Sequence, residues 1–172
     1  MDCPPRDSLT NISALLALDR HLEVLWENLH PDFHYLGPQS FTDPKSDPCQ
    51  LFSLHCIYHL CACILHSSIV PVFSSTPSDP RISKKLTRMS AEEAIKHSIA
   101  VVDMATAFLN LRLDESRLSG VTGYALFVSS SIQFKSLSAQ DKLRSQGTSR
   151  CNAAILILRR LKDFSRPLQC IV

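Results

Sequence analysis

Apolar residues recur every three or four positions over several long segments of the chain, the spacing of a helix face that packs against a partner. The first such segment runs from Ser8 to Leu29, and its apolar stripe consists of Ile12, Leu15, Leu18, Leu22, Leu25 and Leu29. On this pattern we expect Asp19, Glu23 and Glu27 on the opposite, solvent-facing side. The helix is expected to end at His30-Pro31, because a residue before proline resists the helical conformation.

Two further helices are predicted to lie at the centre of the fold, since neither carries a formal charge over most of its length. One begins at Asp47-Pro48, an acidic cap followed by a proline in the first helical position, and runs to about Ser67. The other covers about 118–137 and is apolar nearly all round. Helices of this kind are buried on several sides, so we expect Phe127 in the core.

The remaining pattern predicts two amphipathic helices and no strand. Ser90 and Glu93 have the spacing of a capping box, which places the start of a helix at Ser90, after a long connection over 68–88. A last helix is expected at about Ser149 to Phe164. The sequence therefore predicts an all-α fold: one irregular helical domain over 1–172, with about five main helices, of which two are charge-free and central.

Charge and cysteine content indicate whether the chain binds DNA and in which kind of compartment it is found. Residues 1–80 carry 3 basic and 9 acidic side chains, whereas residues 81–172 carry 15 basic and 7 acidic ones. The basic residues are scattered rather than massed in a stripe, so we expect no DNA binding by this chain alone. The 7 cysteines are odd in number and mostly lie among apolar residues, and we recognise no signal peptide, which favours a reducing compartment.

The segment 54–71 holds most of the candidate chemistry. His55, His59, Cys63 and His66 fall on one face of the predicted helix, and His59 with Cys63 could share a zinc ion. One straight helix can offer only two ligands to an ion, and nothing requires His97 or Cys151 to supply the others. We therefore expect packed histidines, no metal ligand and no cofactor. The chain also lacks every catalytic motif that we recognise, so we expect no catalytic residues and no enzyme.

The same segment is long enough to cross a membrane. Residues 51–73 are largely apolar, and a span needs about 20 such residues. Three histidines, several serines and Pro71 interrupt this stretch, and no Lys/Arg cluster flanks it to set an orientation. A membrane span remains the less favoured alternative.

The order of residues also resembles a known family. Ser13–Pro31 (S-A-L-L-A-L-D-R-H-L-E-V-L-W-E-N-L-H-P) is similar to an L-x-x-L-x-x-W-x-x-x-L-P segment, and 54–71 (L-H-C-I-Y-H-L-C-A-C-I-L-H-S-S-I-V-P) to an L-H-x-x-Y-H-x-x-x-I-L-L-H-x-P helix. The segments M-S-A-E-E-A-I-K-H-S-I-A-V-V-D-M-A (89–105) and G-Y-A-L-F-V-S-S-S-I-Q-F (123–134) follow in the same order. All resemble the regulatory domain, or middle homology region, of fungal zinc-cluster (Zn2Cys6) transcription factors.

The resemblance covers only the C-terminal half of that domain, as expected for a truncated or shortened member of the family. It implies transcription regulation in the nucleus, through protein partners of the transcription machinery or through the rest of a longer factor. DNA would be bound by a zinc-cluster domain, whose cysteine spacing does not occur in this chain. A small-molecule effector is compatible with the resemblance but is not identified by it. The alternatives are a non-enzymatic helical scaffold or adaptor protein and a small membrane-associated protein that spans about residues 51–73.

Overall fold

The computed structural model describes residues 8–75, 77, 79–139 and the single residues 152, 155, 156 and 159, and its regular elements are all helices. This confirms the all-α class. The helices are α1 (Ser8–Glu27), α2 (Pro48–Ser67), α3 (Pro71–Ser74), α4 (Lys84–Asn110) and α5 (Gly120–Ala139), with short 3-10 turns at Pro31–Phe33, Pro38–Phe41 and Glu115–Arg117. The helix predicted at 149–164 lies outside the described residues, apart from the four single positions, which are helical.

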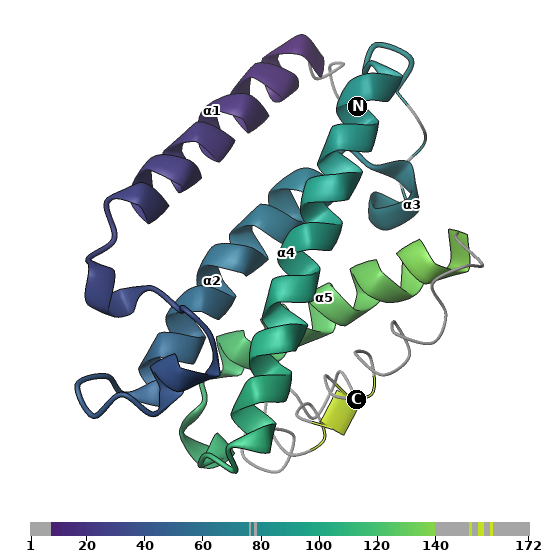
Figure 1. The fold of residues 1–172 in the computed structure, drawn as a ribbon. Helices are drawn as coiled ribbons and strands as arrows, with labels where there is room; N and C mark the ends of the chain where they lie inside the picture. Colours follow the sequence, from purple (N-terminus) through teal and green to yellow (C-terminus); the bar gives the residue numbers. More distant parts are fainter. Residues whose placement is uncertain are drawn as a thin grey trace, which may run out of the picture.

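The helix α2 occupies the middle of the arrangement. It packs against α4 and α5 on one side and is covered by α1 on another, so that α1 forms an outer layer (Figure 1). Its start agrees with the prediction, because the Asp47 carboxylate accepts hydrogen bonds from the backbone N–H groups of Cys49 and Gln50, and Pro48 occupies the first turn. Arg117, which precedes α5, also forms an ion pair with Asp47 and so ties the two helix starts together.

An aromatic cluster forms the centre of the core between α2 and α4. The rings of Phe52 and Phe108 are stacked with centroids 5.1 Å apart, and Phe41 meets both rings edge-on from the loop that precedes α2. Leu126 of α5 and Val101 of α4 are fully buried in the same cluster. Each buried side chain of this size contributes about 1.5–3 kcal/mol through the hydrophobic effect, so this cluster holds three helices together.

The start of α4 differs from the prediction. The helix begins at Lys84, and the Ser83 side chain caps it by accepting a hydrogen bond from the N–H of Leu86. Ser90 lies buried inside the helix, so the capping box that we predicted there is wrong. Nothing in residues 84–89 breaks a helix, and Ser83 caps a free backbone donor about two turns earlier.

The inner face of α1 also differs from the prediction. Leu18 and Leu25 are 57% and 70% exposed, whereas Asp19 and Trp26, the first of which was expected to face solvent, turn towards α2. The helix thus presents the stripe Ile12, Leu15, Asp19, Leu22 and Trp26 to its neighbours. A polar position was acceptable there because Asp19 meets a histidine of α2, and the indole of Trp26 finds an aromatic partner.

The expected burial of Phe127 is wrong as well. Its side chain is 39% exposed, while the neighbouring Leu126 is 0% exposed. Small polar residues of α5 take inner positions instead: the Gln133 amide donates a hydrogen bond to the Ser98 carbonyl of α4 at 2.9 Å. Because the Gln133 amide is satisfied by this hydrogen bond, a helix with only one charged residue, Lys135, can bury a polar side chain and leave another side exposed.

We predict opposite outcomes for two adjacent substitutions in α5. Leu126→Asp places a carboxylate without a partner in the core, which should cost several kcal/mol and unfold the protein. Phe127→Asp leaves its carboxylate in contact with solvent, so helicity should persist with a modest loss of thermal stability. Circular dichroism melting curves of both variants test the placement, and equal melting temperatures would contradict it.

Candidate functional site: a histidine-lined pocket

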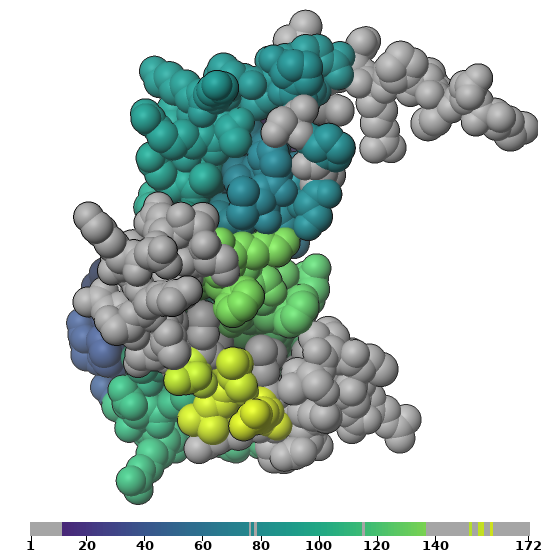
Figure 2. Space-filling view, turned by 90° about the vertical axis from the view of Figure 1, so that its right-hand side faces the viewer, coloured from purple at the N-terminus to yellow at the C-terminus, as the bar shows by residue number. Residues whose placement is uncertain are grey.

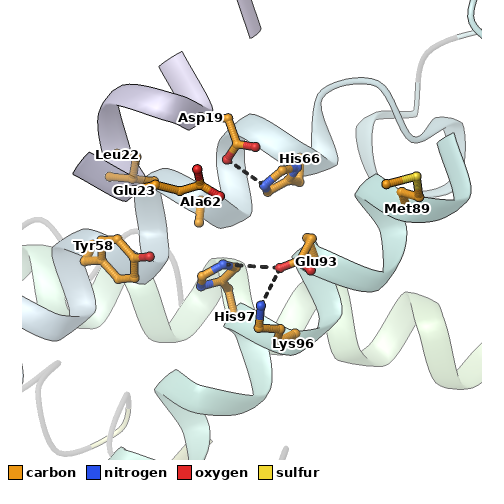
Figure 3. Close-up of a pocket in the computed structure, with 10 residues that line it drawn as sticks. All are labelled: Asp19, Leu22, Glu23, Tyr58, Ala62, His66, Met89, Glu93, Lys96 and His97. Carbon is orange, nitrogen blue, oxygen red and sulfur yellow. Dashed lines mark hydrogen bonds and ion pairs between the residues drawn. The ribbon is translucent and has the colours of Figure 1, made fainter. Parts of the chain in front are cut away.

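A pocket of about 300 Å³ lies where α1, α2 and α4 meet (Figure 3). Its walls carry more polar than apolar groups, which is unusual for a junction between packed helices. The lining residues are Asp19, Leu22 and Glu23 of α1, Tyr58, Ala62 and His66 of α2, and Met89, Glu93, Lys96 and His97 of α4. Three carboxylates, two imidazoles, a phenol and an amine therefore face one small volume.

Aromatic contacts fix α1 against α2 beside this pocket. The rings of Trp26 and Tyr58 are stacked with centroids 3.9 Å apart and planes 20° from parallel. The indole also meets the His55 ring edge-on, with centroids 4.8 Å apart. Such pairs contribute about 0.5–1.5 kcal/mol beyond the area that they bury. Trp26 is therefore the main anchor of α1 on α2, and it sets the position of Asp19 and Glu23 two turns or fewer away.

Asp19 and His66 form the polar contact between α1 and the C-terminal end of α2. The His66 Nε2 atom lies 3.2 Å from an Asp19 carboxylate oxygen, and the imidazole is almost fully buried. The other ring nitrogen, Nδ1, has no hydrogen-bond partner among the described residues. A buried donor or acceptor without a partner costs about 1–3 kcal/mol, so Asp19 supplies the one contact that compensates for burying this histidine.

His59 and His97 join α2 to α4 on the inner side of the pocket. Their Nδ1 atoms are 2.8 Å apart, which is a hydrogen bond in which one ring donates its N–H and the other accepts. A second proton on the accepting nitrogen would set two N–H groups against each other. Only one of the two rings can therefore carry a proton on Nδ1 while the contact lasts.

Burial keeps both of these histidines neutral. It lowers the pKa of His59 to about 3, and the neighbouring His97 adds to this effect. It likewise lowers the pKa of His97 to about 4, with Lys96 acting in the same direction and Glu93 opposing it. Both imidazoles are consequently uncharged near pH 7.

Three carboxylates and one lysine line the pocket. The Lys96 ammonium donates a hydrogen bond to a Glu93 carboxylate oxygen at 2.8 Å, which lowers the pKa of Glu93, and the His97 Nε2 atom lies 3.7 Å from the same oxygen. Burial raises the pKa of the Tyr58 hydroxyl, and the carboxylates of Glu23, Asp19 and Glu93 raise it further. The pocket thus has a negative field at the phenol and, at His97, a neutral imidazole in its wall.

The four residues that were considered for a metal site have four different neighbours. His55 Nε2 lies within hydrogen-bond distance of the Phe33 carbonyl and the Tyr35 N–H, His59 contacts His97, and His66 contacts Asp19. The Cys63 thiol faces the Ala94 carbonyl of α4. Among the residues that the structure describes, no group of three or more histidine, cysteine, aspartate or glutamate side chains is placed to hold a metal ion. Cys151 lies outside them.

The buried thiols are also poorly suited to ligation or nucleophilic chemistry. Burial raises the pKa of Cys56, and it raises that of Cys63 to about 12. The thiolate is the form that binds metals and attacks electrophiles. Both cysteines therefore pack as small apolar side chains, as the sequence suggested.

Sequence reasoning found part of this pocket. It singled out His66 and His97 of the lining, and His59 behind it, but it placed Asp19 on the solvent face and treated Glu93 as a capping residue. Two signals were present in the sequence: Asp19 falls in an apolar stripe at three- and four-residue spacing, and Glu93 and His97 are four residues apart on one helix. The pairing of His59 with His97 depends on how α2 and α4 cross, which no local pattern gives.

No family model matches this chain, and no curated protein or solved structure is significantly similar to it.

We predict that acid weakens the fold through the histidine pair. Folding holds the pKa of His59 and of His97 below the ordinary value of 6.5, so below that pH the unfolded chain binds protons that the folded protein does not. The stability that depends on these two neutral histidines is fully present above about pH 6.5. The free energy of unfolding then falls as the pH is lowered towards 4, by up to about 1.4 kcal/mol per pH unit for each histidine.

Urea unfolding between pH 7.5 and 5 measures this slope. His97→Gln should flatten the slope, because it removes one buried titrating group, whatever its effect on stability at pH 7.5. The matched control is His21→Gln, since His21 is exposed on α1. Equal slopes for wild type and His97→Gln would show that the pair does not control acid sensitivity.

We also predict that the purified protein contains no stoichiometric zinc and that a chelator leaves its melting temperature unchanged. In a structural metal site the free energy of binding becomes free energy of folding, so chelation would lower the melting temperature strongly. Elemental analysis and melting curves with and without EDTA provide the test. One zinc per chain, lost in the double variant His59→Ala/Cys63→Ala, would contradict the prediction.

Proposed function

We propose that this chain is a helical regulatory module of a transcription factor, similar to the regulatory domain of fungal zinc-cluster factors. It acts in the nucleus through protein partners of the transcription machinery or through the rest of a longer factor. DNA binding comes from a zinc-cluster domain outside these residues. The module itself is not an enzyme.

The observation that carries this proposal is the contact of Trp26 with Tyr58 and His55. These three residues belong to the first two segments on which the family resemblance rests, and Trp26 lies far in the sequence from the other two. In the structure they form one aromatic cluster that holds α1 on α2. Residues that resemble a family motif and also make the main contact between two helices support a shared fold better than either segment alone.

The pocket beside that cluster is suited to regulation. It is bounded by three helices, so a molecule bound there would contact α1, α2 and α4 at once. A ligand that binds one arrangement of these helices better than another shifts the population towards it. The described pocket residues offer hydrogen-bonding and charged groups for binding, and they include no cysteine or serine nucleophile.

Two alternatives rest on specific features. Exposed Leu16, Leu18 and Leu25 on α1 are compatible with an adaptor that binds other proteins. The helix α2 is long and apolar enough to cross a membrane, a property that it shares with core helices of soluble proteins. In this structure α2 contacts α1, α4 and α5, and nine of its residues are buried, which favours the role of a core helix.

A tethered reporter assay in fungal cells tests the proposal. Residues 1–172 are fused to a heterologous DNA-binding domain whose sites control the reporter, and we expect output to rise or fall severalfold relative to that domain alone. Trp26→Ala should abolish this effect, because removing a packed tryptophan costs about 3–5 kcal/mol and frees α1.

The matched control is Glu27→Ala, which changes an exposed neighbour on the same helix and should keep the effect. Immunoblots establish equal protein levels, and circular dichroism of the purified variants measures how much of the total helix content each one retains. Reporter output from the wild-type fusion equal to that of the DNA-binding domain alone would refute the proposal.

A further inference from the structure

A second cavity lies at the end of the molecule where α2 ends and α4 begins. Its volume is about 540 Å³, within the range of sites for small ligands and single peptide side chains. Half-buried Ile69, Pro71, Ile82 and Ala91 line this groove, and so do the exposed side chains of Lys84 and Arg88. The elements that form it gather at one end of the space-filling view, in teal (Figure 2).

A tight turn holds the apolar side of the groove in place. The Asp79 carboxylate accepts hydrogen bonds from the backbone N–H and the guanidinium of Arg81, at 2.9 and 3.0 Å. The Asp79 carbonyl accepts another from the N–H of Ile82. Asp79 also lines the groove, but its charge is matched by Arg81. The acidic group inside the groove is thus engaged in forming its wall.

Positive charge is concentrated around this groove. Residues 79–88 contain four basic side chains and one acidic one, a balance of +3, whereas residues 1–78 carry 3 basic and 8 acidic side chains. The basic residues are Arg81, Lys84, Lys85 and Arg88. Glu92, which lies 3.7 Å from Arg88, is the nearest acidic residue on α4.

This concentration is unfavourable for the helix that carries it. The N-terminal end of a helix has partial positive charge, so cations there destabilise it. The first turn of α4 contains no acidic residue that would offset the cost. An anionic partner would offset this repulsion. The basic residues are therefore suited to binding an anionic group.

We propose that this groove binds a short acidic segment of a protein partner. Leucine- or phenylalanine-type side chains of the segment pack between Ile69, Pro71 and Ile82, and its carboxylates pair with Lys84 and Arg88. The apolar walls favour a peptide over nucleic acid, because phosphates need cations and hydrogen-bond donors but no apolar contacts. This inference does not depend on the proposed role in transcription.

Fluorescence anisotropy with labelled peptides tests the inference on the full chain. The first probe alternates glutamate with leucine and phenylalanine, and the second replaces the apolar residues by serine at the same net charge. We expect the first probe to bind, more weakly as salt is raised, and the second to bind about tenfold more weakly or worse. Equal binding of both probes would overturn the role of the apolar walls.

Two charge-reversal variants locate the site. Lys84→Glu/Arg88→Glu should weaken binding of the first probe about tenfold or more. The control Arg20→Glu/Lys45→Glu changes net charge equally at exposed positions away from the groove and should leave binding nearly unchanged. All four positions are exposed, so both variants should stay folded, which circular dichroism checks. Equal weakening by both variants, or tighter binding to duplex DNA or to anionic vesicles than to the peptide, would refute the inference.

Discussion

The burial of α2 is the constraint on which the rest of the structure depends. This helix carries no formal charge, yet it includes three histidines that cannot be buried without partners. Three neighbouring segments supply these partners: α1 offers Asp19 to His66, α4 offers His97 to His59, and the loop before α2 offers backbone groups to His55. The apolar side chains of α2 determine how much surface must be covered, while its histidines determine which residues must lie opposite.

The loop over 28–47, with its two short 3-10 turns, is also shaped by the need to cover α2. Tyr35 and Phe41 come from this loop, and their rings pack against His55, Phe52 and Phe108. The loop is thereby an ordered part of the core, which explains why a segment rich in proline can connect α1 to α2 without leaving the surface of α2 exposed.

The start of α2, its length and the all-α class could be predicted from the sequence, because a cap, a proline and helical periodicity act locally. The same local signals failed where a tertiary contact decided the outcome. Asp19 was predicted to face solvent, but in the structure it contacts His66. Ser90 was predicted to cap a helix, but Ser83 caps the same helix earlier in the chain. A buried Phe127 was predicted because α5 is apolar nearly all round. In the structure Gln133 takes an inner position instead, through a hydrogen bond to the Ser98 carbonyl.

The length of α4 has a consequence for both cavities of the described structure. Its 27 residues extend for about 40 Å at a rise of 1.5 Å per residue, and Arg88 of the groove is followed directly by Met89 of the pocket. The two cavities thus share one helical turn as a common wall. A shift of that turn alters both volumes at once, and thermodynamic linkage makes such coupling reciprocal. A ligand bound in the groove would then change the shape of the histidine-lined pocket, and a ligand in that pocket would change the shape of the groove.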